Sequence, residues 1–276
     1  MADSEIPPQG LSIPNLNPRK IGKINTIGLI TLVQKECSRF TNVYLQTIVT
    51  PMITTLLFYA IFALAFGGDK RMVGDVPYLV FLAPGLIMMS MLQNAFANTS
   101  SSIMISKVQG NIVDVLMPPL SAFEILFGYT IAGMFRGLIV GAACVPAILL
   151  FCPIHVYSIF ALLGFGILGC MLLSMMGVAA GLWAEKFDHL AGVTNFLIVP
   201  MTFLSGTFYS IHVLPELWRN IAYINPFFFI IDGFRYALTG HAQTSLWMGF
   251  GLLFQLNIGL FIFTYAMLLT GYKTKS

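Results

Sequence analysis

Five long stretches without a charged residue constrain the fold more than any other feature of the sequence. These stretches are residues 40–68, 76–106, 137–184, 189–215 and 236–272. A helix that crosses a bilayer needs about 20 mostly apolar residues, so each stretch can hold one span and the third can hold parts of two. Only 9% of the 276 residues are charged, whereas about 25% are charged in an ordinary soluble domain. The sequence therefore predicts an all-α polytopic membrane protein with six transmembrane helices.

The predicted spans divide the chain into a short tail and one membrane domain. The spans are expected at about 43–66, 77–97, 125–151, 158–183, 190–208 and 246–270. Pro51 is expected to kink the first span. Residues 1–23 mix charged residues with four prolines and have no apolar core, so we expect a disordered cytoplasmic tail and not a signal peptide. Residues 24–276 form the predicted membrane domain.

An amphipathic helix at the membrane interface is predicted directly before the first span. After Asn25, a good N-cap residue, apolar residues recur at three- and four-residue steps and charged residues fall between them. The apolar positions are Ile27, Ile30, Val33, Cys37, Phe40 and Tyr44, and the charged positions are Lys35, Glu36 and Arg39. This pattern favours a helix in the headgroup layer. A helix packed only on protein is the alternative.

Residues 107–124 are a polar interruption that could transmit force into the membrane as a cytoplasmic coupling helix. The candidate coupling residues are Lys107, Val108, Gly110, Ile112, Asp114 and Val115. The apolar members of this set recur at helical spacing, which predicts a short helix over residues 107–116 with one face for a partner. The double proline at 118–119 would end this helix, and Ser121 followed by Glu124 predicts a capping box for the next span. The alternative is an ordinary solvated loop.

Residues 211–245 predict two helices that are too short to cross a membrane. Pro215 can open the first helix, and Pro226 restarts a helix of about 13 residues. We expect these short helices to lie at the external interface or to be re-entrant, before the last span. Asp232 and Arg235 are three residues apart in the second helix and share a face. A local or inter-segment ion pair that fixes the re-entrant helix is favoured over contact with a substrate.

Arg136 is the only clear charge in the middle of a predicted span. It lies where Gly133, Gly137 and Gly141 repeat every four residues, a spacing that lets helices approach closely. Burying an arginine at membrane depth costs about 2.5–3.5 kcal/mol unless it is paired or wetted. Two interpretations stay open. Arg136, with Gly133 and Gly137, faces a substrate path or a subunit interface, or the arginine makes structural hydrogen bonds to neighbouring helices.

Lysine and arginine are distributed unequally between the two sides of the predicted topology. With a cytoplasmic N-terminus, the inner side holds Arg19, Lys20, Lys23, Lys35, Arg39, Lys107, Lys186, Lys273 and Lys275, and the outer side holds Lys70, Arg71, Arg219 and Arg235. Cytoplasmic segments are enriched in these residues. Both termini are therefore expected in the cytoplasm.

The sequence lacks the motifs of a membrane enzyme, a metal site or an ATPase. No HExxH helix or GxSxG nucleophile elbow occurs, and the four cysteines have no CxxC spacing, so no catalytic residue and no metal ligand is predicted. The carboxylates lie at span ends or in loops, which disfavours ion-coupled transport. The only Gly–Lys pair, at residues 22–23, lacks the rest of a P-loop. Another polypeptide must supply the energy, or the protein is a passive channel.

Five segments in order resemble the permease subunit of ABC-2 type exporters, in the branch of YadH-like and NodJ-like proteins. The segments are residues 45–62, 81–98, 107–128, 135–141 and 203–238. The resemblance covers nearly the whole chain from about Lys35. At Val113 and Asp114 the chain differs from the pair of glutamates that relatives often carry.

The resemblance implies an interface helix, six spans, a coupling helix between spans two and three, and a re-entrant pair before span six. It also implies a homodimer of permeases in the bacterial inner membrane, with separate ATP-binding subunits that hold ATP and Mg, so no cofactor is expected on this chain. We expect no nucleic-acid partner. The implied function is export of a drug, a lipo-oligosaccharide or a lipid-linked polysaccharide. A passive pore or scaffold without an ATPase partner is the alternative.

Overall fold

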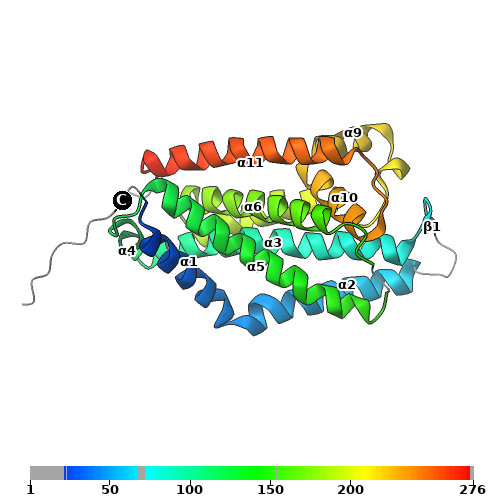
Figure 1. Ribbon diagram of the computed structural model, residues 1–276, viewed down its shortest axis with the longest axis horizontal. Helices are drawn as coiled ribbons and strands as arrows, with labels where there is room; N and C mark the ends of the chain where they lie inside the picture. Colours follow the sequence, from blue (N-terminus) through cyan, green and yellow to red (C-terminus); the bar gives the residue numbers. More distant parts are fainter. Residues whose placement is uncertain (1–21, 23, 67–71, 153–154, 274–276) are drawn as a thin grey trace, which may run out of the picture.

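The computed structural model describes residues 22, 24–66, 72–152 and 155–273, so nearly all of the predicted tail lies outside the described residues. The helices form an elongated bundle (Figure 1). In chain order they are α1 (Thr26–Thr41), the π-helix η1 (Leu45–Val49), α2 (Thr50–Phe66), α3 (Tyr78–Val108), α4 (Ile112–Leu116), α5 (Ala122–Leu149), α6 (Ile159–Trp183), α7 (Phe187–Val193), the π-helix η2 (Thr194–Ile198), α8 (Val199–Phe203), the 3₁₀-helix η3 (Ile211–Val213), α9 (Glu216–Ile224), α10 (Pro226–Thr239) and α11 (Leu246–Leu269). A small hairpin of β1 (Met72–Val73) and β2 (Val76–Pro77) precedes α3.

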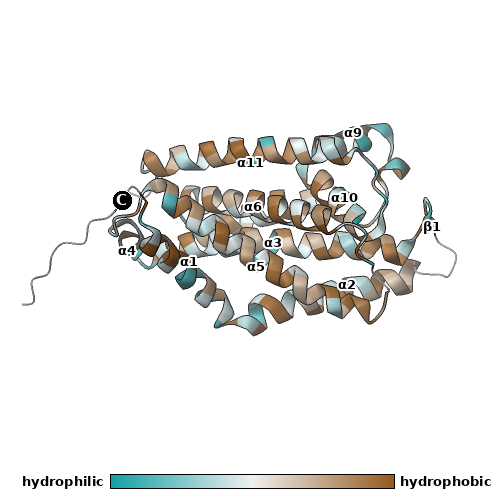
Figure 2. Cartoon of the chain, in the orientation of Figure 1, coloured by the Kyte–Doolittle hydropathy of each residue, from teal (hydrophilic) through white to brown (hydrophobic). Residues whose placement is uncertain are grey.

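Among the described residues, five helices are long and apolar enough to cross a membrane. They are the continuous run Leu45–Phe66, which joins η1 to α2, and α3, α5, α6 and α11. Hydrophilic residues are frequent around α4 at one end of the bundle and around α9 and β1 at the other, called here the α4 end and the α9 end (Figure 2). The prediction of an all-α polytopic membrane protein is confirmed at this level.

The observed helices differ from the predicted spans in two places. The second span was expected to end near residue 97, but α3 continues to Val108. It can do so because the polar side chains of Asn98 and Ser102 are buried and hydrogen-bonded to α1. The span expected at 190–208 is instead the shorter, interrupted run of α7, η2 and α8, which ends at Phe203.

The central helix of the bundle is α3. Its contacts with α6 and with α5 are more extensive than those between any other two described elements. Glycines on both neighbours face it. A Cβ atom at Gly137 of α5 would lie 2.9 Å from the carbonyl oxygen of Met91, and one at Gly177 of α6 would lie 2.5 Å from that of Phe96. No side chain fits at such distances, so the three backbones approach closely. Gly137 therefore serves contact between helices of one chain, as does Gly133, whose Cβ would meet α3 and α6.

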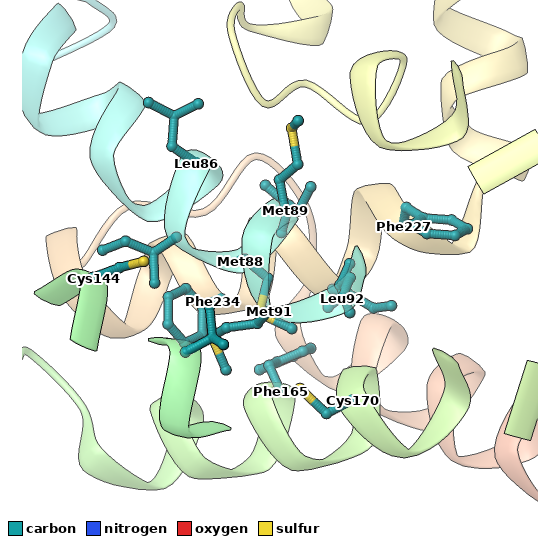
Figure 3. Close-up of a cluster of buried hydrophobic side chains, with 14 of the residues drawn as sticks. Leu86, Met88, Met89, Met91, Leu92, Cys144, Phe165, Cys170, Phe227 and Phe234 are labelled. Carbon is teal, nitrogen blue, oxygen red and sulfur yellow. The ribbon is translucent and has the colours of Figure 1, made fainter. Parts of the chain in front are cut away.

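Sulfur and aromatic side chains fill the space around the middle of α3. Met88 and Met91 meet Phe165 and Cys170 of α6 and Phe234 of α10 (Figure 3). Methionine adapts to irregular gaps between such rings. The contacts also show that α10 lies inside the bundle, against α3 and α6, and not on its outer surface.

Both π-helical turns occur directly before a proline. The turn η1 leads into Thr50 and Pro51, and η2 leads into Val199 and Pro200. Proline lacks the N–H group that an α-helical turn requires, and a wider turn is a common adjustment and a usual cause of kinks. The first predicted span is thus distorted next to Pro51, where the sequence predicts a kink.

The close contact between α3 and α6 predicts opposite effects for two glycine-to-alanine substitutions. Gly177→Ala places a methyl group against the Phe96 carbonyl oxygen and Thr99 Oγ1, and overpacking of this kind costs about 1–3 kcal/mol. Gly251→Ala in α11 has nothing within 4 Å of the new methyl group and should be neutral or stabilising by about 0.5–1 kcal/mol. The measurement is the thermal unfolding midpoint of each purified variant in detergent. Equal midpoints would contradict the close contact.

Candidate functional site

The predicted coupling helix over residues 107–116 is not one helix. Lys107 and Val108 form the last turn of α3, and a new helix, α4, begins only at Ile112. Gly110 lies between them with φ +74°, a left-handed conformation that favours glycine. The prediction of a single helix was wrong because its apolar spacing does not reveal the turn at Gly110.

Lys107 points into the protein and not toward a partner. Its Nζ donates hydrogen bonds to the carbonyl oxygens of Leu182 (2.9 Å) and Ala184 (2.5 Å). These oxygens belong to the last turn of α6 and the residue after it, where a helix leaves its carbonyl groups without intrahelical donors. Lysine is favourable at this end of a helix, so Lys107 ties the end of α3 to the end of α6.

The outward face of α4 differs from the expected one. Ile112 is half-buried and packs against the core cluster that contains Leu32. Val113 is 52% exposed and Met117, one turn later, is 78% exposed, and Asp114 is also exposed. Among the side chains that the structure describes, Val113 and Asp114 of α4 and Met117 directly after it are therefore the ones offered to a partner, and the side chain of the predicted coupling residue Val115 lies outside the described part.

Glu124 joins three segments at the α4 end. The predicted capping box is confirmed: the Glu124 carboxylate accepts hydrogen bonds from the backbone N–H of Ser121 (2.6 Å), and the Ser121 hydroxyl accepts from the backbone N–H of Glu124. The same carboxylate also accepts from the backbone N–H of Asn25, at the start of α1. The Asn25 side chain in turn donates to the carbonyl oxygen of Pro119 (3.3 Å). The start of α1, the loop after α4 and the start of α5 are therefore tied together by hydrogen bonds.

A groove of about 620 Å³ lies beside this joint. Thr26, Ile27 and Lys35 line it from α1, and Asp114 and Pro118 line it from α4 and the loop that follows. Both charges and apolar side chains face the groove, as is common at protein interfaces. Its position at the α4 end (Figure 1) makes it the first candidate for a docking site.

Buried charges fasten α1 to the bundle. The fully buried Glu36 accepts a hydrogen bond from Ser102 Oγ (2.8 Å) and pairs with Arg39 (3.2 Å). Arg39 also donates to the backbone and side-chain oxygens of Asn98 (2.7 and 2.9 Å). Arg39 is 30% exposed, but removing it would leave the buried Glu36 carboxylate without its counter-charge, which is destabilising, so these contacts fix one face of α1 on the bundle. Its other face leaves apolar residues such as Ile27 exposed.

Arg136 reaches across to α3. Its Nη2 donates to Asn94 Oδ1 (3.0 Å), and the Asn94 amide nitrogen donates to the carbonyl oxygen of Ser90 (3.0 Å). Nε of Arg136 is buried and has no hydrogen-bond partner among the described residues. One part of the guanidinium group thus has a structural partner, and Nε is buried without one among the described residues.

A polar strip on α3, which the sequence analysis did not single out, borders a cavity of about 220 Å³. Ser90, Gln93 and Asn94 line the cavity from α3. Gln46, Thr50 and Thr54 line it from η1 and α2, and all three are exposed. Polar side chains at membrane depth are costly when they face lipid. The available signal was the recurrence of polar residues every four positions at 90, 94, 98 and 102 within an apolar stretch.

Asp232 and Arg235 hold α10 inside the bundle. The two side chains are almost fully buried and lie 3.9 Å apart as an ion pair. Arg235 donates to the carbonyl oxygens of Phe81 in α3 (3.2 Å) and Gly206 (2.7 Å). Asp232 accepts from the backbone N–H groups of Gln243 and Thr244, before α11. These contacts connect four segments at the α9 end and leave little of either charge for a substrate.

Comparison with known proteins shows which family this chain is similar to. Residues 28–239 match the family model described as ABC-2 type transporter. The chain is 35% identical to the inner membrane transport permease YadH of Escherichia coli K12 over 251 residues, which are 91% of this chain and 98% of the relative. It is 27% identical to nodulation protein J of Neorhizobium galegae over 188 residues, 66% of this chain and 70% of that protein.

The family match extends from the first turn of α1 to the end of α10 and includes α4, Glu124, Arg136 and the buried ion pair of α10. The similarity to the inner membrane permease continues over nearly its whole length. We conclude that the chain belongs to the ABC-2 type transporter family and is a non-catalytic, multi-pass permease.

Proposed function

We propose that the chain is the transmembrane subunit of an exporter powered by a separate ATP-binding subunit, which holds ATP and Mg. The substrate class is amphiphilic or polymeric: a drug, a lipo-oligosaccharide or a lipid-linked polysaccharide. Membership of the ABC-2 family supports the permease role, and the energy source must lie elsewhere because the sequence has no P-loop. A passive pore is the competing function.

The observation that carries the proposal is the joint at Glu124. A partner seated on Val113, Asp114 and Met117 of α4, or in the adjacent groove, would act on segments that share this carboxylate with the start of α5. Helix α5 is continuous from Ala122 to Leu149 and holds Arg136. Because a helix and its capping contacts are stiff, a displacement of α4 would be transmitted along α5 to the middle of the membrane.

We predict that Val113→Asp lowers recruitment of the ATP-binding subunit and export by about tenfold, as expected for a charge placed in an interface, where it costs about 1–3 kcal/mol. Val113 is 52% exposed, so folding and membrane insertion should persist. The matched control is Val156→Asp, which changes an equally exposed valine (55%) before α6. The measurements are co-purification of the two subunits and export by membrane vesicles. If the Val113→Asp variant exports normally and still binds the ATP-binding subunit, α4 does not couple the two subunits, and the passive pore becomes the favoured function.

We propose six spans, with α7, η2 and α8 as the fifth. Residues 187–203 provide about 25 Å of helix, slightly less than the hydrocarbon thickness of about 30 Å. The irregular backbone after Phe203 is buried in protein, where polar groups find partners: the carbonyl oxygen of Gly206 accepts from Arg235 Nη2 (2.7 Å), and that of Phe208 accepts from the Tyr78 hydroxyl (3.2 Å). Non-helical backbone is tolerated at membrane depth under this condition. In this proposal α10 is re-entrant, since it turns back within the bundle.

We propose that the α4 end and both termini face the cytoplasmic side of the inner membrane, because lysines gather at this end. The prediction uses single cysteines in a chain whose native cysteines are replaced. A membrane-impermeant thiol reagent added outside intact cells should label Val213→Cys, which is 82% exposed before α9, and should not label Gln109→Cys until the cells are opened. Labelling of Gln109→Cys in intact cells would reverse the orientation.

We propose that two copies enclose a path along the polar strip of α3 and the exposed polar residues of η1 and α2. The Thr50 and Thr54 hydroxyls donate to carbonyl oxygens of their own helical run (3.1 and 3.0 Å), but a lipid-facing position would expose the Gln46 side-chain amide to hydrocarbon at membrane depth. A second copy would shield these residues and enclose the cavity that they share with Asn94. Arg136 lies behind Asn94 and is positioned to act on a substrate in this path.

We predict that Arg136→Leu reduces export at least tenfold while expression and insertion stay normal or improve, since an apolar residue inserts more readily at this depth. The matched control is Phe135→Leu, a neighbour on α5 that is 44% exposed and makes none of the Arg136 contacts. Export and the amount of protein inserted in the membrane are measured for both variants. Wild-type export by Arg136→Leu would show that the arginine is only tolerated.

A further inference from the structure

An apolar groove of about 660 Å³ lies between α6, α11 and the α7–η2 run, near the α4 end. Its floor includes Phe96 of α3, and the small side chains of Ala179 and Ala180 create the hollow. Leu197 and Phe263 form its rims and are 43% and 58% exposed. The volume is within the range of about 300–1,000 Å³ that is usual for small-molecule sites. The groove extends over about 10 Å of α11, between Leu260 and Met267 at 1.5 Å per residue.

Water is a poor occupant for this groove. A bound water needs two to four polar partners, and the lining residues are apolar apart from the ring N–H of Trp183 and the hydroxyl of Tyr272. An empty groove would leave these side chains without packing partners. A flexible hydrocarbon chain is the chemistry that fits the lining.

The mouth of the groove has a different character. Trp183 and Tyr272 lie at its α4 end, and such rings are enriched where a membrane meets water. Lys273 Nζ lies 6.0 Å from the Trp183 ring and 5.9 Å from the Tyr272 ring. Its hydrogen bond with Glu185 (2.6 Å) raises the pKa of Lys273, so this lysine stays charged. Apolar walls therefore lead to an aromatic mouth that carries the ion pair of Lys273 and Glu185, and the Lys273 ammonium group is the part of it that an anionic headgroup would contact.

We infer that this groove binds one acyl chain of an anionic glycerophospholipid from the bilayer, with the lipid phosphate at Lys273. Basic residues beside a crevice between membrane helices recognise anionic headgroups in this way. With the orientation proposed above, the lipid belongs to the cytoplasmic leaflet. The site lies away from the polar strip of α3 and from the α4 groove, so it is a lipid site separate from the proposed export path and from ATPase docking.

The test uses quenching of Trp183 fluorescence by phospholipids with brominated acyl chains. Trp218 and Trp247 are replaced by phenylalanine, which leaves Trp183 as the only tryptophan. The full chain is placed in nanodiscs that contain increasing fractions of brominated phosphatidylglycerol or brominated phosphatidylcholine. Both leaflets have the same composition and no ATPase is present, so the result does not depend on the orientation or on the exporter function.

A specific site should give saturating quenching at low fractions of phosphatidylglycerol, with apparent binding at least threefold tighter than for phosphatidylcholine. Lys273→Gln should reduce this preference to near one, and Glu185→Gln, which frees Lys273, should increase it. Lys35→Gln removes an exposed lysine of α1 that does not line the groove, and should leave the preference unchanged. Ala179→Leu fills the hollow and should weaken quenching by both lipids.

Three results would overturn the inference. Quenching that is proportional to the bromolipid fraction and equal for the two headgroups would mean an ordinary lipid boundary only. A preference that survives Lys273→Gln would place the headgroup elsewhere. Absence of quenching by either lipid would mean that a second copy of the chain covers the groove. Lys273 is a surface residue after the last helix, so its substitution keeps the test valid even where Ala179→Leu fails to fold.

Discussion

The close approach of α3 to α5 and α6 is the constraint on which the rest of the structure depends. Two rows of glycine, on α5 and on α6, face α3 and bring the helix backbones close together. Between helices in lipid the hydrophobic effect offers little, so close packing and hydrogen bonds must hold the bundle together. Once α3 is fixed in this way, its polar strip, the buried α10 and the attachment of α1 all have defined positions.

Charged side chains inside the bundle fasten its helices to one another through hydrogen bonds and ion pairs. Glu36 and Arg39 attach α1 to α3, while Arg235 and Asp232 attach α10 to α3 and to the segment before α11. An unpaired charge in this environment would cost several kcal/mol, so these pairs specify one arrangement of the helices. Arg136 and Arg235 each have one buried guanidinium nitrogen, Nε and Nη1, without a hydrogen-bond partner among the described residues. Arg235 nevertheless has the Asp232 carboxylate 3.9 Å away, whereas no carboxylate among the described residues pairs with Arg136, and this missing counter-charge is the physical reason to connect Arg136 with function.

The two ends of the bundle differ in how they could move. At the α9 end, four segments meet at one buried ion pair. At the α4 end, α1, the loop after α4 and α5 share Glu124, while α4 itself exposes Val113 and Met117. Under the proposed orientation, the end fastened by the ion pair is external, and the end joined through Glu124 is the one on which an ATP-binding subunit would act. The π-turns before Pro51 and Pro200 provide places where α2 and α8 can bend relative to this frame.

The sequence by itself determined the class of protein, the positions of the long helices, the capping box at Ser121 and the two short helices before α11, because each depends on local periodicity, proline chemistry or apolar length. The tertiary structure alone decided that α3 continues past residue 97, that Ile112 faces inward, and that Lys107 caps α6. It also revealed that the glycine row of α6 packs against α3 and that the polar strip of α3 borders a cavity. These features depend on contacts between residues far apart in the chain: a polar side chain remains in an apolar helix only when a distant segment satisfies it, and no local pattern records that partner.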